Sequence, residues 1–195
     1  MSGATGSSSM APLSWFAQAM GAPLSGSDGS VGRVVTDSRH IRAGDLFVAL
    51  RGDRFDGHDF AIGAARDGAI GVVCERALAD VPVVQLIVPD ALIALQAAAQ
   101  AWRRRYADPV VAVTGSNGKT TTKQLLASVF AARGPVLATR GNLNNHIGLP
   151  LTLLELREAH RTAVIEMGAN HLGEIARLTE LTQPQVGVIT QAGDA

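Results

Sequence analysis

Cysteine, aromatic residues and excess charge are all scarce in this sequence of 195 residues. The single cysteine, Cys74, allows no intramolecular disulfide and is typical of a reducing compartment such as the cytoplasm. Lysine and arginine together number 17, as do aspartate and glutamate, so the formal net charge is zero. A net charge of zero gives no overall attraction to nucleic acid or to an anionic membrane, and we expect neither as a partner.

Long apolar runs, a signal peptide and histidine pairs with metal-binding spacing are also missing. No apolar run approaches the roughly 18 residues that a membrane-spanning helix requires. The first ten residues, MSGATGSSSM, lack the basic and apolar segments of a signal peptide, and we interpret residues 1–10 as a flexible tail. None of the five histidines forms a pair of the HExxH type, which argues against zinc. We expect a cytoplasmic protein that acts as a monomer, without membrane insertion.

Aliphatic side chains dominate what is present, since hydrophobic residues make up 47% of the chain and aromatic residues only 4%. This composition, with alternating strand-like and helix-like segments, predicts an α/β fold. In the first half we predict strands at Val31–Asp37, Leu46–Leu50, Ile70–Cys74 and Val83–Val88, and helices at Pro12–Met20, His58–Asp67 and Ala91–Tyr106. In the second half we predict strands at Val110–Val113, Val136–Thr139, Thr162–Met167 and Val186–Thr190, and helices at Lys119–Ala132, Leu149–Leu156 and Gly173–Leu181.

Asp108 and Pro109 mark the predicted boundary between a domain at residues 11–108 and a second at residues 109–195. The regular alternation in the second domain predicts a parallel sheet with right-handed crossovers, and ligands of such sheets bind at the carboxyl ends of the strands. The basic run Arg103–Arg105 closes a predicted helix. We expect this run to face solvent and to complement the helix dipole.

The stretch VVAVTGSNGKTTT, residues 110–122, predicts a phosphate-binding loop between a buried strand and a helix. The amides of Ser116 to Lys119 can face phosphate oxygens, and the helix N-terminus adds a partial positive charge. Lys119 can reach the β- and γ-phosphates, and the Thr120 hydroxyl can bind Mg²⁺. The general GxxxxGK pattern would place its first glycine at position 113, which is Val113 here. The alternative is a glycine-rich turn before a helix with a chance lysine.

Two further loops are predicted to reach the same edge of the sheet. Asn142, Asn144 and Asn145 follow one strand, and their amides suit either nucleotide phosphates and metal-bound water or a turn with a helix cap. Glu166 ends an apolar strand, where a carboxylate is costly without a partner such as Mg²⁺. An exposed glutamate at a strand end is the alternative. His171 follows that loop, either near the site or at the surface.

Three segments of the second domain, TGSNGKTTT, GNLNNHIGLPLTLL and EMGANHLGEIARL, resemble in order and spacing the Mur ligases of peptidoglycan synthesis. Upstream, TDSRHIRAGDLFVALRG followed by DGHDF is similar to the uridine-nucleotide-binding N-terminal domain of that family. The resemblance runs from about Val34 to the end of the chain. The shortened phosphate loop matches the form that this family uses.

The resemblance implies an ATP-dependent ligase that needs Mg²⁺ and joins D-alanyl-D-alanine to UDP-N-acetylmuramoyl-tripeptide through an acyl phosphate. It implies a small UDP-binding α/β domain followed by the first part of a parallel-sheet ATPase domain. Lys119 would be catalytic, and Thr120 and Glu166 would hold Mg²⁺. The UDP part of the substrate would lie near Asp37, Ser38, Arg39, Arg51, Gly52 and Asp53. The implied ATP site comprises Gly115, Ser116, Asn117, Gly118, Lys119, Thr120, Thr121 and either or both of Asn144 and Asn145.

Other assignments of function account for only part of these motifs. A related Mur ligase that adds the third amino acid shares the N-terminal motifs, but the Asn-Asn-His-Ile-Gly and Glu-Met-Gly-Ala-Asn segments argue against it. Folylpolyglutamate synthases share the phosphate loop but lack the uridine domain. A nucleotide-binding module without ligase activity is the alternative from another class. The family also uses a histidine metal ligand, a carbamylated lysine and a C-terminal domain, so we expect these 195 residues alone not to complete ligation.

Overall fold

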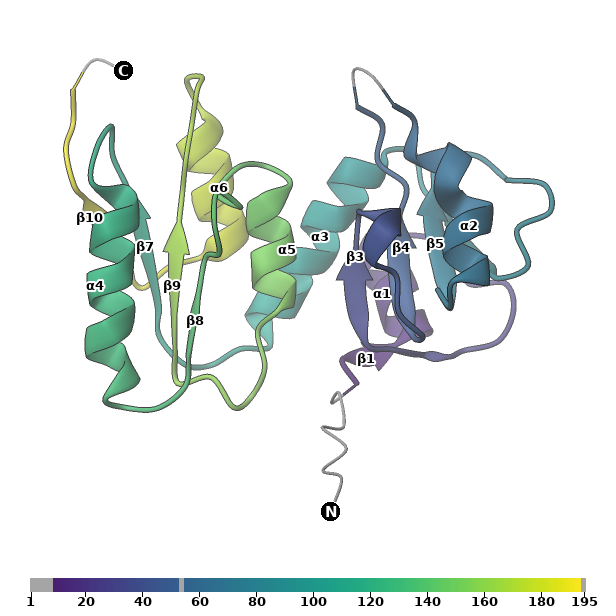
Figure 1. Cartoon of the computed structure of the whole chain (residues 1–195), viewed down its shortest axis with the longest axis horizontal. Coiled ribbons are helices and arrows are strands. Elements are labelled where there is room, and N and C mark those ends of the chain that lie inside the picture. Colours follow the sequence, from purple (N-terminus) through teal and green to yellow (C-terminus); the bar gives the residue numbers. More distant parts are fainter. Residues whose placement is uncertain (1–8, 53–54, 194–195) are drawn as a thin grey trace. The chain divides into compact units, whose positions relative to one another are not determined.

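Two parallel sheets of four strands each form the framework of the chain in a computed structural model, which describes residues 9–52 and 55–193. Contacts within the chain separate two compact units, residues 1–95 and 96–195, and the division falls inside the helix α3 (Ala91–Arg104). Figure 1 shows the elements of each unit. The predicted α/β class is confirmed.

The sheet of the first unit has the order β3-β4-β5-β6, and all neighbours are parallel. Its strands are β3 (Arg33–Val35), β4 (Asp45–Val48), β5 (Gly71–Cys74) and β6 (Val84–Ile87). The short antiparallel strands β1 (Ala11–Pro12) and β2 (Ser30–Val31) form a separate pair. The helices are α1 (Leu13–Met20) and α2 (Ala61–Arg66), and η1 (Ser38–His40) and η2 (Gly57–Phe60) are 3₁₀ turns.

The central strands β4 and β5 of this first sheet are buried on both faces, as continuous apolar strands require. Phe47 and Val72 pack with Ala61 and Ala64 of α2 in one core cluster. On the other face, a side chain at Gly71 would press within 3.2 Å of Leu13 in α1, so glycine allows that helix to lie close to β5. The predicted strand at Val31–Asp37 is divided in the structure between β2 and β3.

The predicted tail at residues 1–10 falls mostly outside the described residues. Met10, however, is buried, and its amide donates to the Val31 carbonyl at 2.8 Å. Met10 therefore belongs to the folded part of the chain. The helix α1 ends where predicted, since Gly21 adopts a left-handed φ of 68° that favours glycine.

The sheet of the second unit has the order β10-β7-β9-β8, again parallel throughout. Its strands are β7 (Val110–Thr114), β8 (Val136–Ala138), β9 (Thr162–Glu166) and β10 (Val186–Ile189). The helices are α4 (Lys119–Ala131), α5 (Gly148–Leu154) and α6 (Glu174–Thr182). The chain passes from β7 through α4 to β8 and then turns back through α5 and α6. Right-handed crossovers therefore place α4 on one face and the other two helices on the opposite face.

The predicted solvent exposure of the basic run Arg103–Arg105 is wrong for Arg103, of which only 4% is exposed. Its guanidinium donates to the carbonyls of Thr182 at 2.8 Å, Tyr106 at 2.8 Å and Gln183 at 3.0 Å. Two of these carbonyls belong to the end of α6, which has unpaired acceptors as every helix C-terminus does. Burial lowers the pKa of Arg103, and these acceptors keep the charge solvated.

In the part of the chain that the structure describes, no helix is long and apolar enough to cross a membrane.

Candidate nucleotide-binding and active site

The loop after β7 has the backbone that a phosphate-binding loop needs. Gly115 has a φ of 136°, and a side chain there would collide with the Thr190 hydroxyl and lie 2.9 Å from the Gln191 nitrogen. Gly118 has a φ of 79° and precedes α4, whose first turn is not capped by a side chain. Val113, where the general pattern has glycine, is a buried residue of β7. The turn is therefore made by Gly115 and Gly118.

Lys119 folds back over this loop. Its ammonium donates to the Gly115 carbonyl at 2.7 Å and to the Ser116 carbonyl at 3.4 Å. Ser116 differs from expectation, because its amide donates to the Gln191 carbonyl at 2.9 Å and not toward an open phosphate position. The Lys119 ammonium thus already lies at the loop that a phosphate would approach.

Glu166 is the centre of a polar cluster at the carboxyl end of β9, and only 2% of it is exposed. Its carboxylate accepts hydrogen bonds from Thr120 Oγ1 at 3.1 Å and Asn144 Nδ2 at 2.9 Å. Lys123 Nζ lies 3.0 Å from Oε2 as a salt bridge. Burial disfavours the charged form, but the hydrogen bonds from Asn144 and Lys123 outweigh it and keep the pKa of Glu166 below its usual range.

The two asparagines of the loop after β8 have different partners. Asn144 reaches Glu166, and its carbonyl accepts from the Gly168 amide at 2.9 Å. Asn145 instead accepts from the amides of Ile147 and Gly148 at 3.1 and 2.8 Å, at the start of α5. The geometry brings Asn144 to the cluster and gives Asn145 the capping contacts that were its alternative.

Lys123 is the member of this cluster that sequence reasoning missed. It lies four residues after Lys119, so the two lysines share one face of α4. That spacing was a usable signal. The spacing alone could not predict the contact with Glu166, because that also requires knowing that this face of α4 packs toward the end of β9. His171, by contrast, is exposed and pairs with Glu174 at 3.3 Å.

The oxygen atoms at this edge fit a magnesium ion that also binds a nucleotide. Mg²⁺ typically takes one or two protein oxygens and completes its shell with waters and phosphates. The Thr120 hydroxyl and the Glu166 carboxylate provide such oxygens 3.1 Å apart. Within residues 9–52 and 55–193 there is no group of three or more His, Cys, Asp or Glu side chains arranged to hold a metal. The donor set therefore suits a nucleotide-bound Mg²⁺ better than a metal held by protein ligands alone.

The candidate UDP residues of the first unit lie after β3 and β4, two neighbouring parallel strands. Asp37 accepts from the Arg39 amide at 3.0 Å and from its guanidinium at 2.9 and 2.6 Å. The Arg39 side chain is the main reason that the pKa of Asp37 falls to about 2. Ser38 lies between them in η1.

Arg51 and Gly52 follow β4, and Asp53 lies outside the described residues. Arg51 Nε is 3.4 Å from Asp56 and 3.5 Å from Glu75, and its side chain is half exposed. The Gly52 amide donates to the Phe55 carbonyl at 2.9 Å. The exposed guanidinium could meet a diphosphate.

The buried His58 connects two segments through hydrogen bonds: Asp56, which follows the Arg51 loop, and Glu75, which directly follows β5. Its Nδ1 bonds the Asp56 carboxylate, and its Nε2 accepts from the Glu75 amide at 2.9 Å. A ring nitrogen that accepts must carry no proton, so His58 is neutral with its hydrogen on Nδ1. The His58 amide is the largest of the contacts that lower the pKa of Asp56 to about 2. This network was not anticipated from the sequence.

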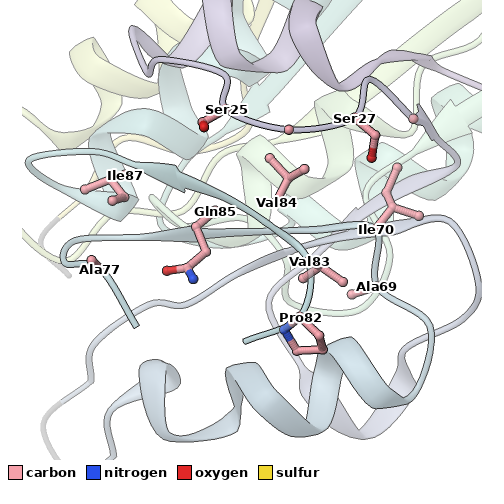
Figure 2. A pocket seen from close by; sticks show the side chains of 12 residues that line it. Ser25, Ser27, Ala69, Ile70, Ala77, Pro82, Val83, Val84, Gln85 and Ile87 are labelled. Atoms are coloured by element: carbon pink, nitrogen blue, oxygen red, sulfur yellow. The ribbon is translucent and has the colours of Figure 1, made fainter. Parts of the chain in front are cut away.

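A pocket of about 750 Å³ in the first unit lies away from these residues. Figure 2 shows Ser25 and Ser27 on one side and Val84, Gln85 and Ile87 of β6 on the other. The Gln85 amide is already bonded in both directions to Leu78, at 2.8 and 2.9 Å. The side chains of the lining therefore offer little beyond serine hydroxyls, and none of the predicted UDP residues that the structure describes contributes to it.

Comparison with known proteins finds relatives for both halves of the chain. Residues 30–108 match the family profile described as "Mur ligase family, catalytic domain", and residues 113–195 match "Mur ligase middle domain". The chain is 46% identical over 167 residues to UDP-N-acetylmuramoyl-tripeptide–D-alanyl-D-alanine ligase of Synechocystis sp.. That match covers 85% of this chain and 37% of the relative.

Solved structures of similar proteins give the same result. A MurF crystal structure from Acinetobacter baumannii has a TM-score of 0.89 at 41% identity, covering 95% of this chain and 42% of that one. The MurF ligase of Thermotoga maritima, solved in complex with ADP, has a TM-score of 0.76 at 38% identity. That match covers 84% of this chain and 38% of the other. The chain thus spans about two fifths of the length of the proteins it matches.

Proposed function

Because this chain belongs to the Mur ligase family, we propose that it forms part of an ATP-dependent ligase that adds D-alanyl-D-alanine to UDP-N-acetylmuramoyl-tripeptide. The observation that carries the proposal is the convergence of Lys119, Thr120 and Glu166 at one sheet edge, in a chain 46% identical to a ligase of that name. Such a ligase works in the cytoplasm, where ATP is available, and residues 11–108 and 109–195 would be its first two domains.

The proposed chemistry has two steps. The tripeptide carboxylate attacks the γ-phosphorus of ATP, forming an acyl phosphate and releasing ADP. The amine of D-alanyl-D-alanine then attacks the acyl carbon, and inorganic phosphate leaves as the amide forms. Catalysis of phosphoryl transfer is mainly positioning and charge stabilisation.

Each residue of the site has a role in this scheme. Lys119 exchanges the carbonyls of Gly115 and Ser116 for the transferred phosphoryl group. Thr120 and Glu166 would hold Mg²⁺, which neutralises phosphate charge when bound, and Asn144 orients the Glu166 carboxylate. In the first unit, Asp37, Ser38, Arg39 and the loop at Arg51 and Gly52 would lie near the UDP group.

Phosphate release by the longest natural protein that contains this chain tests the proposal. Release should require ATP, UDP-muramoyl-tripeptide and D-alanyl-D-alanine together. Release with a dipeptide substrate and a single amino acid would instead identify the ligase that adds the third residue. Nucleotide binding with no release under any combination would identify a binding module.

Lys119→Ala should lower the rate of this release by about 100-fold or more, because a preorganised charge at the transferring group is lost. Arg133→Ala, which removes an exposed charge after the other end of α4, is the matched control and should leave the rate unchanged. Equal rates for Lys119→Ala and the wild type would refute the assignment of the loop.

We also propose that the 195 residues alone bind ATP and the UDP-linked substrate without completing ligation. Titration calorimetry with a non-hydrolysable ATP analogue and with UDP-muramoyl-tripeptide would measure the two binding events. Turnover by the 195-residue chain at a rate comparable to that of the longer protein would contradict this.

A further inference from the structure

The salt bridge between Lys123 and Glu166 is the most deeply buried ion pair at the candidate active site. The side chains are 5% and 3% exposed, and Nζ lies 3.0 Å from Oε2. Pairs this deep contribute little net stability, because the desolvation of both charges offsets their attraction. Packing alone therefore does not explain why a lysine lies here.

The position of the pair is more informative than its strength. Lys123 and Thr120 both contact the same oxygen of Glu166, and Asn144 takes the other oxygen. Both carboxylate oxygens thus already contact protein donors, and the negative charge is balanced by Lys123. A cation bound by Thr120 and Glu166 would have to share Oε2 with the Lys123 ammonium.

We propose that Lys123 is a positioning residue that acts as the built-in counter-cation of Glu166, holding the carboxylate in place and neutralised until a divalent cation takes over its charge. The inference rests on the proposed role of Glu166 in binding Mg²⁺. In the absence of metal, the Lys123 ammonium compensates the negative charge of the buried Glu166 carboxylate. In its presence, two positive groups compete for one carboxylate, so Lys123 keeps the affinity for free metal low.

The matched test compares two ion pairs whose carboxylates are buried. Lys123→Met removes the charge while keeping the length of the side chain. Arg33→Met, in the first unit, leaves the equally buried carboxylate of Asp45 without its arginine. Thermal unfolding of each variant is measured in Mg²⁺ and in EDTA.

We expect both variants to lose stability in EDTA, and only Lys123→Met to recover most of it in Mg²⁺. Binding of Mn²⁺ alone, followed by electron paramagnetic resonance, should be about fivefold or more tighter in Lys123→Met than in the wild type. Lys123→Arg, which keeps the charge, should bind Mn²⁺ as the wild type does. The double variant Lys123→Met/Glu166→Gln should show no response to either metal.

If Lys123→Met is unfolded in EDTA, recovery of its circular dichroism on addition of Mg²⁺ supports the inference, and failure to recover overturns it. Equal metal responses of Lys123→Met and Arg33→Met would also overturn it, because any unpaired buried carboxylate would then suffice. The proposed function is tested separately, by phosphate release in the wild type. That release can succeed while Lys123→Met shows no metal response, in which case only the role of Lys123 fails.

Discussion

Arg103 shows how one residue can join segments that are distant in the sequence. It follows the pattern of a basic helix end, which usually lies in solvent, yet its partners at Thr182 and Gln183 come about 80 residues later. Nothing in the local sequence indicates where those carbonyls will lie. The carbonyls at the C-terminus of a helix have no partner within the helix. At the end of α6 the buried Arg103 guanidinium donates to two of them, in place of water.

Replacing Arg103 should therefore destabilise the second unit. Arg103→Met leaves three carbonyl acceptors without a donor, at a cost of about 2–4 kcal/mol in the free energy of unfolding. The adjacent and exposed Arg104 provides the control, since Arg104→Met should change stability by less than about 0.5 kcal/mol. Urea unfolding of the two variants measures the difference. A loss of equal size in both would show that helix-dipole effects, and not the buried contacts, are responsible.

At the scale of single residues, the sequence predicted which polar groups lie at the sheet edge better than it predicted their hydrogen-bond partners. Lys119, Thr120 and Glu166 were identifiable because the lysine and threonine open a helix directly after a strand and the glutamate ends one, and strand ends converge in a parallel sheet. Asn144 and Asn145 could not be separated, because their roles depend on a turn that points one toward Glu166 and the other toward α5. Lys123 required knowledge of how α4 rests on the sheet.

Among the elements, the helix α3 has contacts that reach the candidate active site. Gln96 is 6% exposed and donates to the His146 carbonyl at 3.1 Å, in the loop that carries Asn144. Its oxygen accepts from the Arg177 guanidinium of α6 at 3.2 and 3.0 Å. One amide thus connects α3, α6 and the asparagine loop.

Gln96→Met should loosen that loop while keeping the shape of the side chain. We expect a loss of about 1–3 kcal/mol in stability, because the His146 carbonyl loses its donor and the Arg177 guanidinium keeps only its contact with Glu180. We also expect weaker binding of a non-hydrolysable ATP analogue, because Asn144 is less well held. Gln100→Ala is the control, since Gln100 also bonds α6, through the Glu180 carbonyl at 2.9 Å, but does not contact the loop. If both variants bind the analogue equally well, the loop is held without Gln96.

Periodic apolar segments predicted the order of the main strands and helices but not the short strand β1, and the boundaries were less certain. The predicted helix at His58–Asp67 is in fact the turn η2 followed by α2, because the Asp56 carboxylate accepts from the His58 amide at 3.0 Å and shapes the entry. Side-chain contacts of this kind compete with regular helix bonding and leave little trace in periodicity.

For the whole molecule, the two units carry separate reporters. Trp15 lies in α1 of the first unit and Trp102 belongs to the second unit, where its Nε1 donates to the Leu156 carbonyl at 3.0 Å. Single-tryptophan variants, Trp15→Phe and Trp102→Phe, therefore allow the unfolding of each unit to be followed by fluorescence. The pH dependence of stability can then be assigned to one unit or the other.

Among the residues that the structure describes, Asp37 and Asp56 are the two carboxyls whose pKa lies near 2, and both belong to the first unit. A pKa lowered by folding stabilises the folded state above the unfolded value of about 3.9. This contribution decreases below that pH and is lost as the pH falls through the folded-state pKa of about 2. The Trp15 signal should therefore show stability decreasing between about pH 4 and pH 2. The share of Asp37 should be small and sensitive to salt, because the side chain of its partner Arg39 is 81% exposed.

Asp56→Asn should make the Trp15 signal less dependent on pH and leave the Trp102 signal unchanged. At neutral pH this variant should be less stable than the wild type, since it loses the ion pair with Arg51 and the negative charge that strengthens the hydrogen bond from His58 Nδ1. The difference should shrink as the pH falls through the folded-state pKa of about 2 and vanish only below it, where the wild-type carboxyl is also protonated. Asp59→Asn, an exposed neighbour in η2, should follow the wild-type curve. A constant difference between Asp56→Asn and the wild type at every pH would mean that Asp56 acts through packing and not through its charge.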